Sequence, residues 1–534
     1  MDSPKRLSFL SYAVNGGGVG HLVRQIAIQK WLRRFCAFTG TKSEHWFLTT
    51  SEADSICFHE GFSAFKLPSK TIVDDAGLDK VAYIAMAKQW VWNSLTLLRP
   101  DVLVVDTFPN GSFHELGNAL DVVKHKALVL RPVKQPFARR GAFQSLVQLY
   151  DRVVVPEHED DEPTLLDELG LPPSRVAFTG PIVRSDRFDA FSAAEAKKRL
   201  GIAEGKRAVV VTGGGGGDAG IDAFFDAVAA FADARADVHV VYAAGPLFRG
   251  RPRRGPSSTF FTGHDLAEHF AAFDVAVCAA GFNTIHELLF AGVPTLVVPQ
   301  TKIADDQLAR ARRYADRSAL RLTSTATVFA DLSALLADTT ALAALSQAAR
   351  AQMPVNHAKD AAREILSLVL APSILRAAAE ALDDEFVAGA GKDIADVVDL
   401  ALALQGKGDR AALSTKAALA LSTSTQTPAL ALSRVVEQLK KKVRTDDVVD
   451  LVSTLFASPA IAGQHGGLVT LLQALLPERA VDGSVVVKAI VDAAGRAAGE
   501  GKDLLTLARS LPSGMDNLGR LRAVGRLSSS GGVV

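Results

Sequence analysis

Short apolar runs that end in glycine or a polar residue recur along the chain up to about residue 370, and segments with helical spacing follow them. Leu7–Val14, Asp101–Asp106, Ala208–Thr212, Val238–Ala243 and Val275–Ala279 are runs of this kind. Apolar runs of this length without alternation are typical of parallel strands that are buried on both faces. The pattern therefore predicts two successive strand–helix series, and hence two doubly wound, Rossmann-like parallel sheets that face each other across a cleft.

The pattern changes near residue 371. Alanine and leucine dominate from there, aromatic residues nearly vanish, and apolar residues recur at spacings of three and four. This predicts an all-helical extension over residues 371–534. A first domain over residues 1–180 and a second over residues 181–370, whose last helix packs back, precede it. The pattern leaves open whether the extension binds a protein partner or stabilises the rest of the chain.

Composition excludes several classes of protein. A chain of 534 residues is too long for one core, and its formal net charge of +1 gives no global attraction to nucleic acid or to anionic membranes. The three cysteines form no metal-binding or disulfide spacing, which fits a reducing cytoplasm. No apolar run approaches the ~18 residues that a membrane span requires, and the N-terminus does not read as a signal peptide. We therefore expect a cytoplasmic protein, with contact at the inner face of a membrane left open.

A glycine-rich loop joins the first predicted strand to the first predicted helix. Gly16, Gly17, Gly18 and Gly20 lie in this loop, and His21 opens the helix. In this layout a backbone can approach phosphate or sugar oxygens at a helix N-terminus. The spacing lacks the last glycine of the dinucleotide fingerprint, so we set a nicotinamide-binding interpretation aside.

Asp106 places a carboxylate at the carboxyl end of a buried strand. A role in a ligand site and a role as a turn or helix cap fit this position equally well. We expect His114 and Glu115 to open the helix behind this strand.

The second half of the chain contains two further candidate segments. Gly213–Gly217 is a run of five glycines whose entropic cost favours close approach to a ligand over a simple turn. A turn at Gly281 is followed by a predicted helix from Thr284, where Glu287 has the spacing of a capping box. Spacing alone favours the capping role, although ligands of open α/β sheets bind at this end of the strands.

Taken together, four stretches resemble the two-domain inverting glycosyltransferases of family 28, and in particular a bacterial branch of predicted glycosyltransferases. They occur in the order of the family over residues 5 to about 370, and the helical extension is not covered. The four stretches are Gly16–Leu22 with Arg24, Thr179–Arg184, Thr212–Gly217, and Ala280–Glu287 followed by Asp305–Gln307.

The resemblance implies a glycosyltransferase B fold with the acceptor on the first domain and a nucleotide-sugar donor, UDP-linked, on the second. It implies that Glu287 binds the ribose hydroxyls and that the backbone near Gly263 and His264 faces the base. The sugar hydroxyls would be read by Asp306 and Gln307. The diphosphate would meet a set of backbone amides, which are those of Gly214, Gly215, Gly216, Gly217, Gly281, Asn283 and Thr284.

The sequence departs from the family at the second glycine loop, which carries no polar side chain where serine is usual. Contacts to the diphosphate would therefore come from the backbone alone. We find no Asp-X-Asp type of acidic motif, so we expect no metal and no cofactor, because oriented amides and a helix dipole can stabilise a leaving diphosphate.

These observations predict an inverting, metal-independent glycosyltransferase that moves a hexose or N-acetylhexosamine from a UDP-sugar to a hydroxyl acceptor. His21 and Asp106 are the two candidates for the catalytic base. The alternatives are a UDP-sugar 2-epimerase of the same fold and a non-catalytic nucleotide-sugar-binding scaffold in which residues 371–534 recruit a partner.

Overall fold

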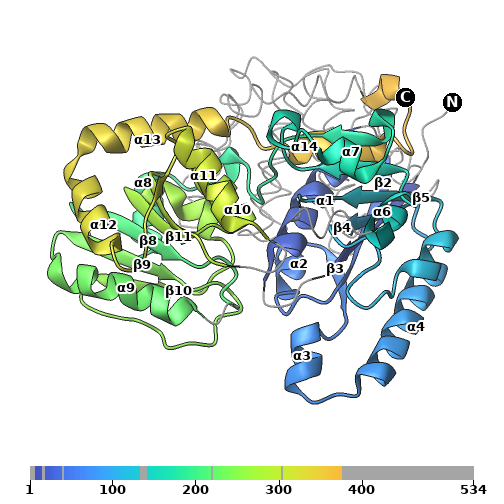
Figure 1. The fold of residues 1–534 in the computed structure, drawn as a ribbon, viewed down its shortest axis with the longest axis horizontal. Helices are drawn as coiled ribbons and strands as arrows, with labels where there is room; N and C mark the ends of the chain where they lie inside the picture. Colours follow the sequence, from blue (N-terminus) through green and yellow to red (C-terminus); the bar gives the residue numbers. More distant parts are fainter. Residues whose placement is uncertain are drawn as a thin grey trace, which may run out of the picture. The chain divides into compact units, whose positions relative to one another are not determined.

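The computed structural model describes residues 6–14, 18–38, 41–132, 141–217, 220–301 and 305–375. Residues 1–32 and 43–375 belong to one compact unit, which carries both sheets (Figure 1). Gly16, Gly17 and the predicted helical extension beyond residue 375 lie outside the described residues.

The first sheet has seven strands in the order β3-β2-β1-β4-β5-β6-β7. Parallel pairing joins β1 to β4, β4 to β5, β5 to β6, β6 to β7 and β2 to β3. The order reverses beside β1, so the loops after β1 and β4 lie together at the point where open α/β sheets bind ligands. The strands are β1 Arg6–Ala13, β2 Lys42–Thr49, β3 Ser63–Lys66, β4 Val102–Asp106, β5 His125–Val129, β6 Arg152–Val155 and β7 Val176–Phe178.

The second sheet has six strands in the order β10-β9-β8-β11-β12-β13, and all of its pairings are parallel. Its order reverses beside β8, which places the loops after β8 and β11 together. The strands are β8 Arg207–Thr212, β9 Val238–Ala243, β10 Ser258–Phe261, β11 Val275–Ala279, β12 Thr295–Val298 and β13 Arg321–Leu322.

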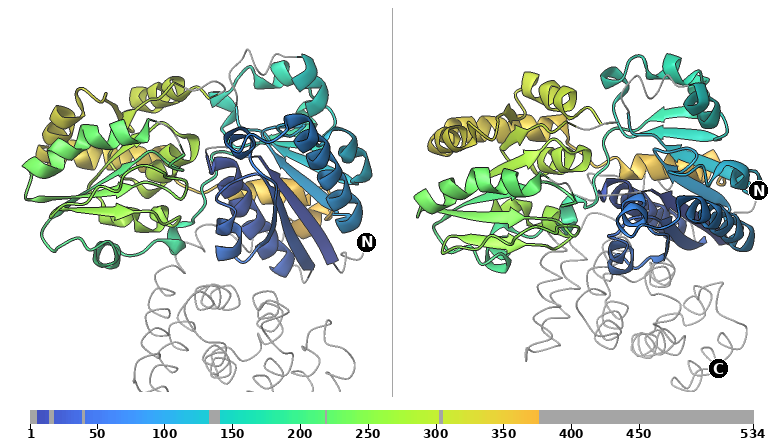
Figure 2. Two further views of the ribbon diagram at one scale, coloured as in Figure 1. Left: turned by 90° about the horizontal axis from the view of Figure 1, so that it is seen from below. Right: turned by 60° about the horizontal axis from the view of Figure 1, so that its bottom comes forward.

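Helices cover both faces of each sheet, as Figures 1 and 2 show. The α-helices are α1 Gly20–Phe38, α2 Ser55–His59, α3 Lys70–Asp75, α4 Lys80–Leu98, α6 Gly141–Val147, α7 Leu165–Leu169, α8 Ala193–Arg199, α9 Ile221–Ala234, α10 Phe282–Ala291, α11 Gln307–Asp316, α12 Val328–Ala337, α13 Thr339–Gln352 and α14 Ala358–Leu366. The short 3-10 helices are η1 Gly117–Val122, η2 Glu159–Asp161, η3 Pro173–Arg175, η4 Arg187–Asp189 and η5 Leu266–Ala272.

Strand β8 shows why the apolar runs have no alternation. Val209 and Val211 belong to a core built with α9 and α12, while Ala208 and Val210 belong to a second core built with α10 and η5. Both faces of the strand are therefore buried, as expected for a parallel sheet between two helical layers. The predicted α/β class with two doubly wound sheets is confirmed for the described residues.

Two local predictions were wrong. Helix α10 begins at Phe282 with Gly281 as its N-cap, and no side chain caps it, so Thr284 and Glu287 form no capping box. The ring of Phe282 is buried, and this residue is the first of the helix. Gly281 has an extended backbone, so the helix does not continue N-terminal to Phe282.

His114 and Glu115 do not open a helix, because η1 begins at Gly117. His114 has a left-handed φ of 59°, which breaks the helical path. The Glu115 carboxylate accepts hydrogen bonds from the backbone of Ser112 and Phe113 instead, at 3.0 and 2.6 Å.

Among the described residues, no single helix is both long enough and apolar enough to cross a membrane. Helices α12 and α13 meet that test only as a pair, and the pair is bent by 99°.

Candidate functional site

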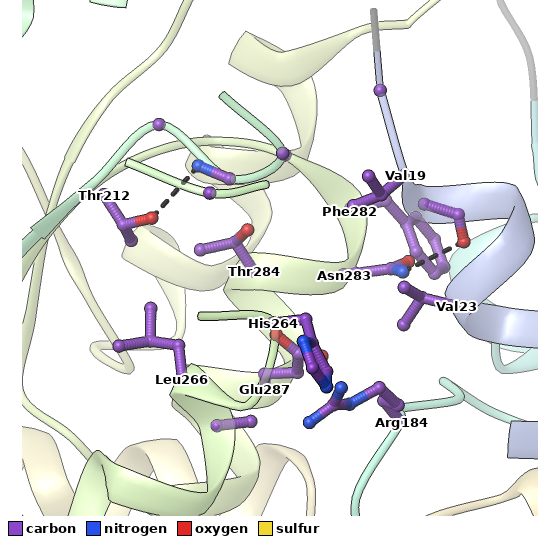
Figure 3. A pocket seen from close by; sticks show the side chains of 18 of the residues that line it. Val19, Val23, Arg184, Thr212, His264, Leu266, Phe282, Asn283, Thr284 and Glu287 are labelled. Carbon is purple, nitrogen blue, oxygen red and sulfur yellow. Dashed lines mark hydrogen bonds between the residues drawn. The ribbon is translucent and has the colours of Figure 1, made fainter. Parts of the chain in front are cut away.

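A cavity of about 420 Å³ opens at the carboxyl ends of the central strands and is lined from both sheets (Figure 3). The start of α1, the glycine loop after β8 and the start of α10 form its walls. The predicted site residues that line it are Gly18, Gly20, His21, Gly214, Gly215, Gly263, His264, Gly281, Asn283, Thr284, Glu287 and Gln307.

The remaining described candidates lie nearby without lining the cavity. Asp106 is fully buried behind His21, and Gly216 and Gly217 continue the glycine loop away from the cavity. The carboxylate of Asp306 caps α11 by accepting the amide of Ala309 at 3.1 Å, while its neighbour Asp305 lines the cavity.

His21 and Asp106 form a hydrogen-bonded pair at the base of the cavity. His21 lies in the first turn of α1, and its Nδ1 is 2.5 Å from Oδ1 of Asp106 at the end of β4. Arg24, one helical turn further along α1, donates to the same carboxylate through Nε at 3.0 Å and Nη2 at 2.6 Å. The hydroxyl of Thr107 donates to it at 2.9 Å. These donors fix the orientation of the carboxylate.

The electrostatics of this pair favour a neutral imidazole. Burial would raise the pKa of Asp106, but the charge of Arg24, together with the hydrogen bonds that His21 and Arg24 donate, holds that pKa far below its usual range. Burial lowers the pKa of His21, and the charge of Arg24 lowers it further, against the opposite effect of Asp106. Because the ionised Asp106 can only accept, Nδ1 of His21 carries the proton and Nε2 keeps its lone pair. A neutral imidazole of this tautomer can accept a proton at Nε2.

The N-terminus of α10 supplies hydrogen-bond donors on the opposite wall. The amides of the first helical residues have no partner within a helix, and the Gly281 cap provides no side-chain acceptor. Asn283 donates from Nδ2 to the carbonyl of Gly20 at 3.1 Å (Figure 3). Its Oδ1 is buried and has no hydrogen-bond partner among the described residues. A helix terminus with free amides and a positive dipole end suits a phosphate group.

The glycine run after β8 serves two purposes. A Cβ on Gly216 would stand 2.0 Å from the Ala244 carbonyl oxygen, so packing within the protein requires this glycine. A Cβ on Gly213 would stand 2.7 Å from Cδ1 of Ile221, the end of a side chain that can shift. Gly214 and Gly215 are the members of the run that line the cavity. The amide of Gly214 is held by the Thr212 hydroxyl at 3.1 Å (Figure 3). Close approach to a ligand therefore explains only part of the run.

Glu287 lies one turn further along α10, beside Arg184 and His264 (Figure 3). Burial raises its pKa from 4.5 to about 7, although the Arg184 guanidinium acts in the opposite direction. Burial likewise lowers the pKa of His264, whose ring lies 4.3 Å from that of His59. A carboxylate in this position would accept hydrogen bonds from the hydroxyls of a ligand.

Three functional candidates were not given roles from the sequence. Arg24 occupies the helical position three residues after His21, a spacing that places both on one face, so the sequence did contain a signal for it. Arg131 is 3.3 Å from Asp305, whose carboxylate also accepts from Arg310 at 2.5 Å. Nothing in the sequence pairs Arg131 with Asp305, because the contact depends on how the two sheets are packed.

Among the residues with described positions, no group of three or more histidine, cysteine, aspartate or glutamate side chains is arranged to hold a metal ion. The expectation of a metal-independent reaction stays a prediction.

Two parallel sheets with a cavity at their carboxyl ends define the class of two-domain α/β proteins to which glycosyltransferases of the B type belong. Residues 208–365 match the model of the glycosyltransferase family 28 C-terminal domain. Over these residues the chain is similar to the C-terminal domain of family 28, and the resemblance seen in the sequence is confirmed.

A curated relative from Bacillus licheniformis, a UDP-N-acetylglucosamine--N-acetylmuramyl-(pentapeptide) pyrophosphoryl-undecaprenol N-acetylglucosamine transferase, is 29% identical over 160 residues. The match covers 28% of this chain and 43% of that protein. The chain spans about half the length of the curated relatives it matches.

Two solved structures resemble the chain at a coarser level. The glycosyltransferase of kitacinnamycin has 16% identity and a TM-score of 0.47, with 69% of this chain and 100% of that one covered. A UDP-N-acetylglucosamine 2-epimerase assigned in Listeria monocytogenes has 13% identity and a TM-score of 0.48, with 68% and 96% covered. These likenesses do not distinguish a transferase from an epimerase.

Proposed function

We propose that this chain is an inverting glycosyltransferase that takes a hexose or N-acetylhexosamine from a UDP-sugar, without a metal, and transfers it to a hydroxyl acceptor. The observation that carries this proposal is the placement of a neutral histidine, oriented by a buried carboxylate, across one cavity from free backbone amides. The first feature removes a proton and the second stabilises a departing diphosphate.

In the proposed reaction, the acceptor hydroxyl binds on the His21 side of the cavity. Nε2 of His21 takes the hydroxyl proton while the acceptor oxygen forms a bond to the anomeric carbon. The bond between that carbon and the β-phosphate oxygen breaks, the electron pair stays on UDP, and the anomeric configuration inverts. Asp106 stabilises the imidazolium that forms and keeps Nδ1 protonated throughout. Asp106 touches no reacting atom and is therefore a positioning residue in this scheme.

The leaving group would be stabilised by the chain's backbone. The amides at the start of α10 and that of Gly215 would face the diphosphate, where negative charge develops, while the Gly214 amide already donates to Thr212. Asn283 holds the α10 start against Gly20, which keeps the amides and the base at a fixed separation. Preorganised donors of this kind need no rearrangement during the reaction.

Selectivity for the donor would come from side chains around the same cavity. Glu287 would accept from the ribose hydroxyls, and the segment at Gly263 and His264 would face the base. On the opposite side, Asp305 and Gln307 line the cavity and would read the sugar hydroxyls. Asp305 here replaces Asp306, which the structure places as a helix cap.

Contact with a membrane surface is also proposed, through one face of α4. Met86, Trp90 and Leu97 lie on this face and are 71%, 48% and 83% exposed, and the helix carries lysines but no acidic residue. Exposed apolar side chains in such a group mark an interaction surface. We expect the full chain to co-sediment with anionic vesicles and the Trp90→Ser/Leu97→Ser variant to lose most of that binding. Equal sedimentation of the two proteins would refute this surface.

The transfer proposal is tested with labelled UDP-sugars and two acceptor pools, a lipid extract and a water-soluble extract of bacterial cells, in the presence of EDTA. We expect label to move from one UDP-sugar into one pool, with release of UDP. The control is His21→Ala, which should bind UDP with unchanged affinity and transfer no label. Conversion of the donor to its 2-epimer without UDP release would establish the epimerase instead, and equal transfer by His21→Ala would refute His21 as the base.

A further inference from the structure

A second cavity, of about 340 Å³, lies behind the first and shares Glu287, Ala267 and Phe270 with it. Its walls come from η5, from the second half of α10 and from residues 183–190. Most of the lining residues are apolar, and Val183, Phe270 and Phe290 are the largest of these. The predicted donor segments do not use this space, because the glycine loop and the start of α10 line only the first cavity.

Two arginines line this cavity without a counter-ion. Arg187 and Arg350 are both solvent-exposed, and their side chains make no ion pair or hydrogen bond with any residue that the structure describes. The guanidinium of Arg187 lies 4.8 Å from the centre of the Phe290 ring. Burial lowers the pKa of Arg187, and the nearby charge of Arg350 lowers it further, so the two cations lie close enough to repel each other.

The backbone at the end of α10 leaves room for the side chain of Arg350. Gly292 ends α10 with a φ of 72°, and a Cβ there would stand 2.2 Å from Nε of Arg350. The arginine stem therefore packs directly across the glycine. The carboxylate of the neighbouring Asp186 is engaged on another side, because it accepts from Nδ2 of Asn356 at 2.8 Å.

Two unpaired guanidiniums beside an aromatic face favour an anion with an apolar body. A phosphate or carboxylate accepts from arginine in a bidentate manner, and such charge-assisted bonds are stronger than those between neutral groups. The apolar walls suit an aromatic or aliphatic body, and the volume lies within the range of small-molecule sites. Glu287 also lines this cavity and would accept from a hydroxyl of such a ligand.

We propose that this second cavity is a separate binding site for a small organic anion, with an aromatic or aliphatic body between Phe270 and Phe290 and its phosphate or carboxylate on Arg187 and Arg350. The site is independent of the transferase proposal, since none of its residues except Glu287 takes part in that reaction. Because the two cavities share a wall, a ligand in the second cavity would lie next to the donor without occupying the donor cavity.

The test uses phenyl phosphate as the probe, inorganic phosphate as the probe without an apolar body, and the full chain. Calorimetric titration should show binding of phenyl phosphate, and inorganic phosphate should bind several-fold more weakly. In Arg187→Gln/Arg350→Gln we expect the phenyl phosphate Kd to rise at least about tenfold, the loss that a 1.4 kcal/mol change produces. The matched control Arg254→Gln, at an exposed arginine outside the cavity, should leave it unchanged.

Titration with UDP separates this proposal from the transferase proposal. The double variant should bind UDP as the wild type does, and saturating UDP should not displace phenyl phosphate. If the double variant loses its cooperative melting transition, Arg187→Gln alone carries the test, because it leaves the packing on Gly292 intact. No binding of phenyl phosphate at about 10 mM, equal binding by wild type and variant, or displacement by UDP would each overturn the second site.

Discussion

Replacing Glu287 with glutamine distinguishes two effects of this buried carboxylate, which are its cost to folding stability and its contribution to ligand binding. Glu287 and glutamine have nearly the same shape, so the change removes the charge and keeps the packing of α10. Burial raises the pKa of Glu287 from 4.5 to about 7, which means that the folded protein resists ionisation of this group. The group is held in its position by the fold, at a free-energy cost that a ligand's hydroxyls could recover.

The size of the effect follows from linkage between protonation and folding. A raised pKa in the folded state gives stability that is present below pH 4.5 and is lost as the pH rises through about 7. At 1.36 kcal/mol for each pH unit, the shift corresponds to at most about 3 kcal/mol above pH 7. For a domain of this size that is a difference of about 6 °C or more in Tm. Glu287→Gln lacks this loss, so it should melt higher than the wild type at pH 8.5.

The assay compares melting of wild type and Glu287→Gln at pH 5.5 and pH 8.5 in the same salt. We expect the Tm advantage of the variant to grow by several degrees between the two pH values, while its affinity for UDP falls at least about tenfold, as the loss of a charged hydrogen-bond partner implies. A Tm difference that does not change with pH would refute the buried-carboxylate account, and unchanged UDP affinity would refute the ribose contact.

The catalytic pair and the glycine loop give three further predictions. His21→Ala should lower kcat by about 10²- to 10⁴-fold. In the wild type, kcat should fall with decreasing pH only below about pH 6.5, because burial lowers the pKa of His21. A decrease in kcat that begins above that pH would contradict this. Asp106→Asn leaves the buried Arg24 without its counter-charge, so urea unfolding should show a loss of about 3–5 kcal/mol; a loss below about 1 kcal/mol would mean that the ion pair is not structural. Gly216→Ala should lower Tm strongly, whereas Gly220→Ala, where a Cβ meets open space, should not; equal Tm values would refute the packing role of the loop.

The strands of both sheets could be predicted from the sequence, because a strand that is buried on both faces consists of an uninterrupted apolar run. The run at Val275–Ala279 coincides with β11, and Val238–Ala243 coincides with β9. The start of α10 was misplaced because polar residues at Asn283 and Thr284 looked like caps, while the burial of Phe282 decided where the helix begins. Local capping preferences are weaker than the burial of an aromatic ring.

The candidate site was only partly visible in the sequence. The two loops that carry His21 and Glu287 were recognisable from their glycines, since a strand–glycine–helix layout is a local feature. The pairing of His21 with Asp106 joins residues 85 positions apart, and spacing alone could not choose between a cap and a site for Asp106. The arginines of the second cavity left no signal at all, because Arg187 and Arg350 are 163 positions apart and neither belongs to a motif.

The most direct test of the central claim is a thermal-shift measurement of the purified chain against a panel of nucleoside diphosphates and nucleotide sugars, with EDTA present. A ligand that binds only the native state must raise the Tm by mass action. We predict a rise with UDP and with one UDP-sugar, reduced or abolished in Glu287→Ala. A folded chain whose Tm does not change with any nucleotide would contradict the proposal that this cavity binds a nucleotide-sugar donor.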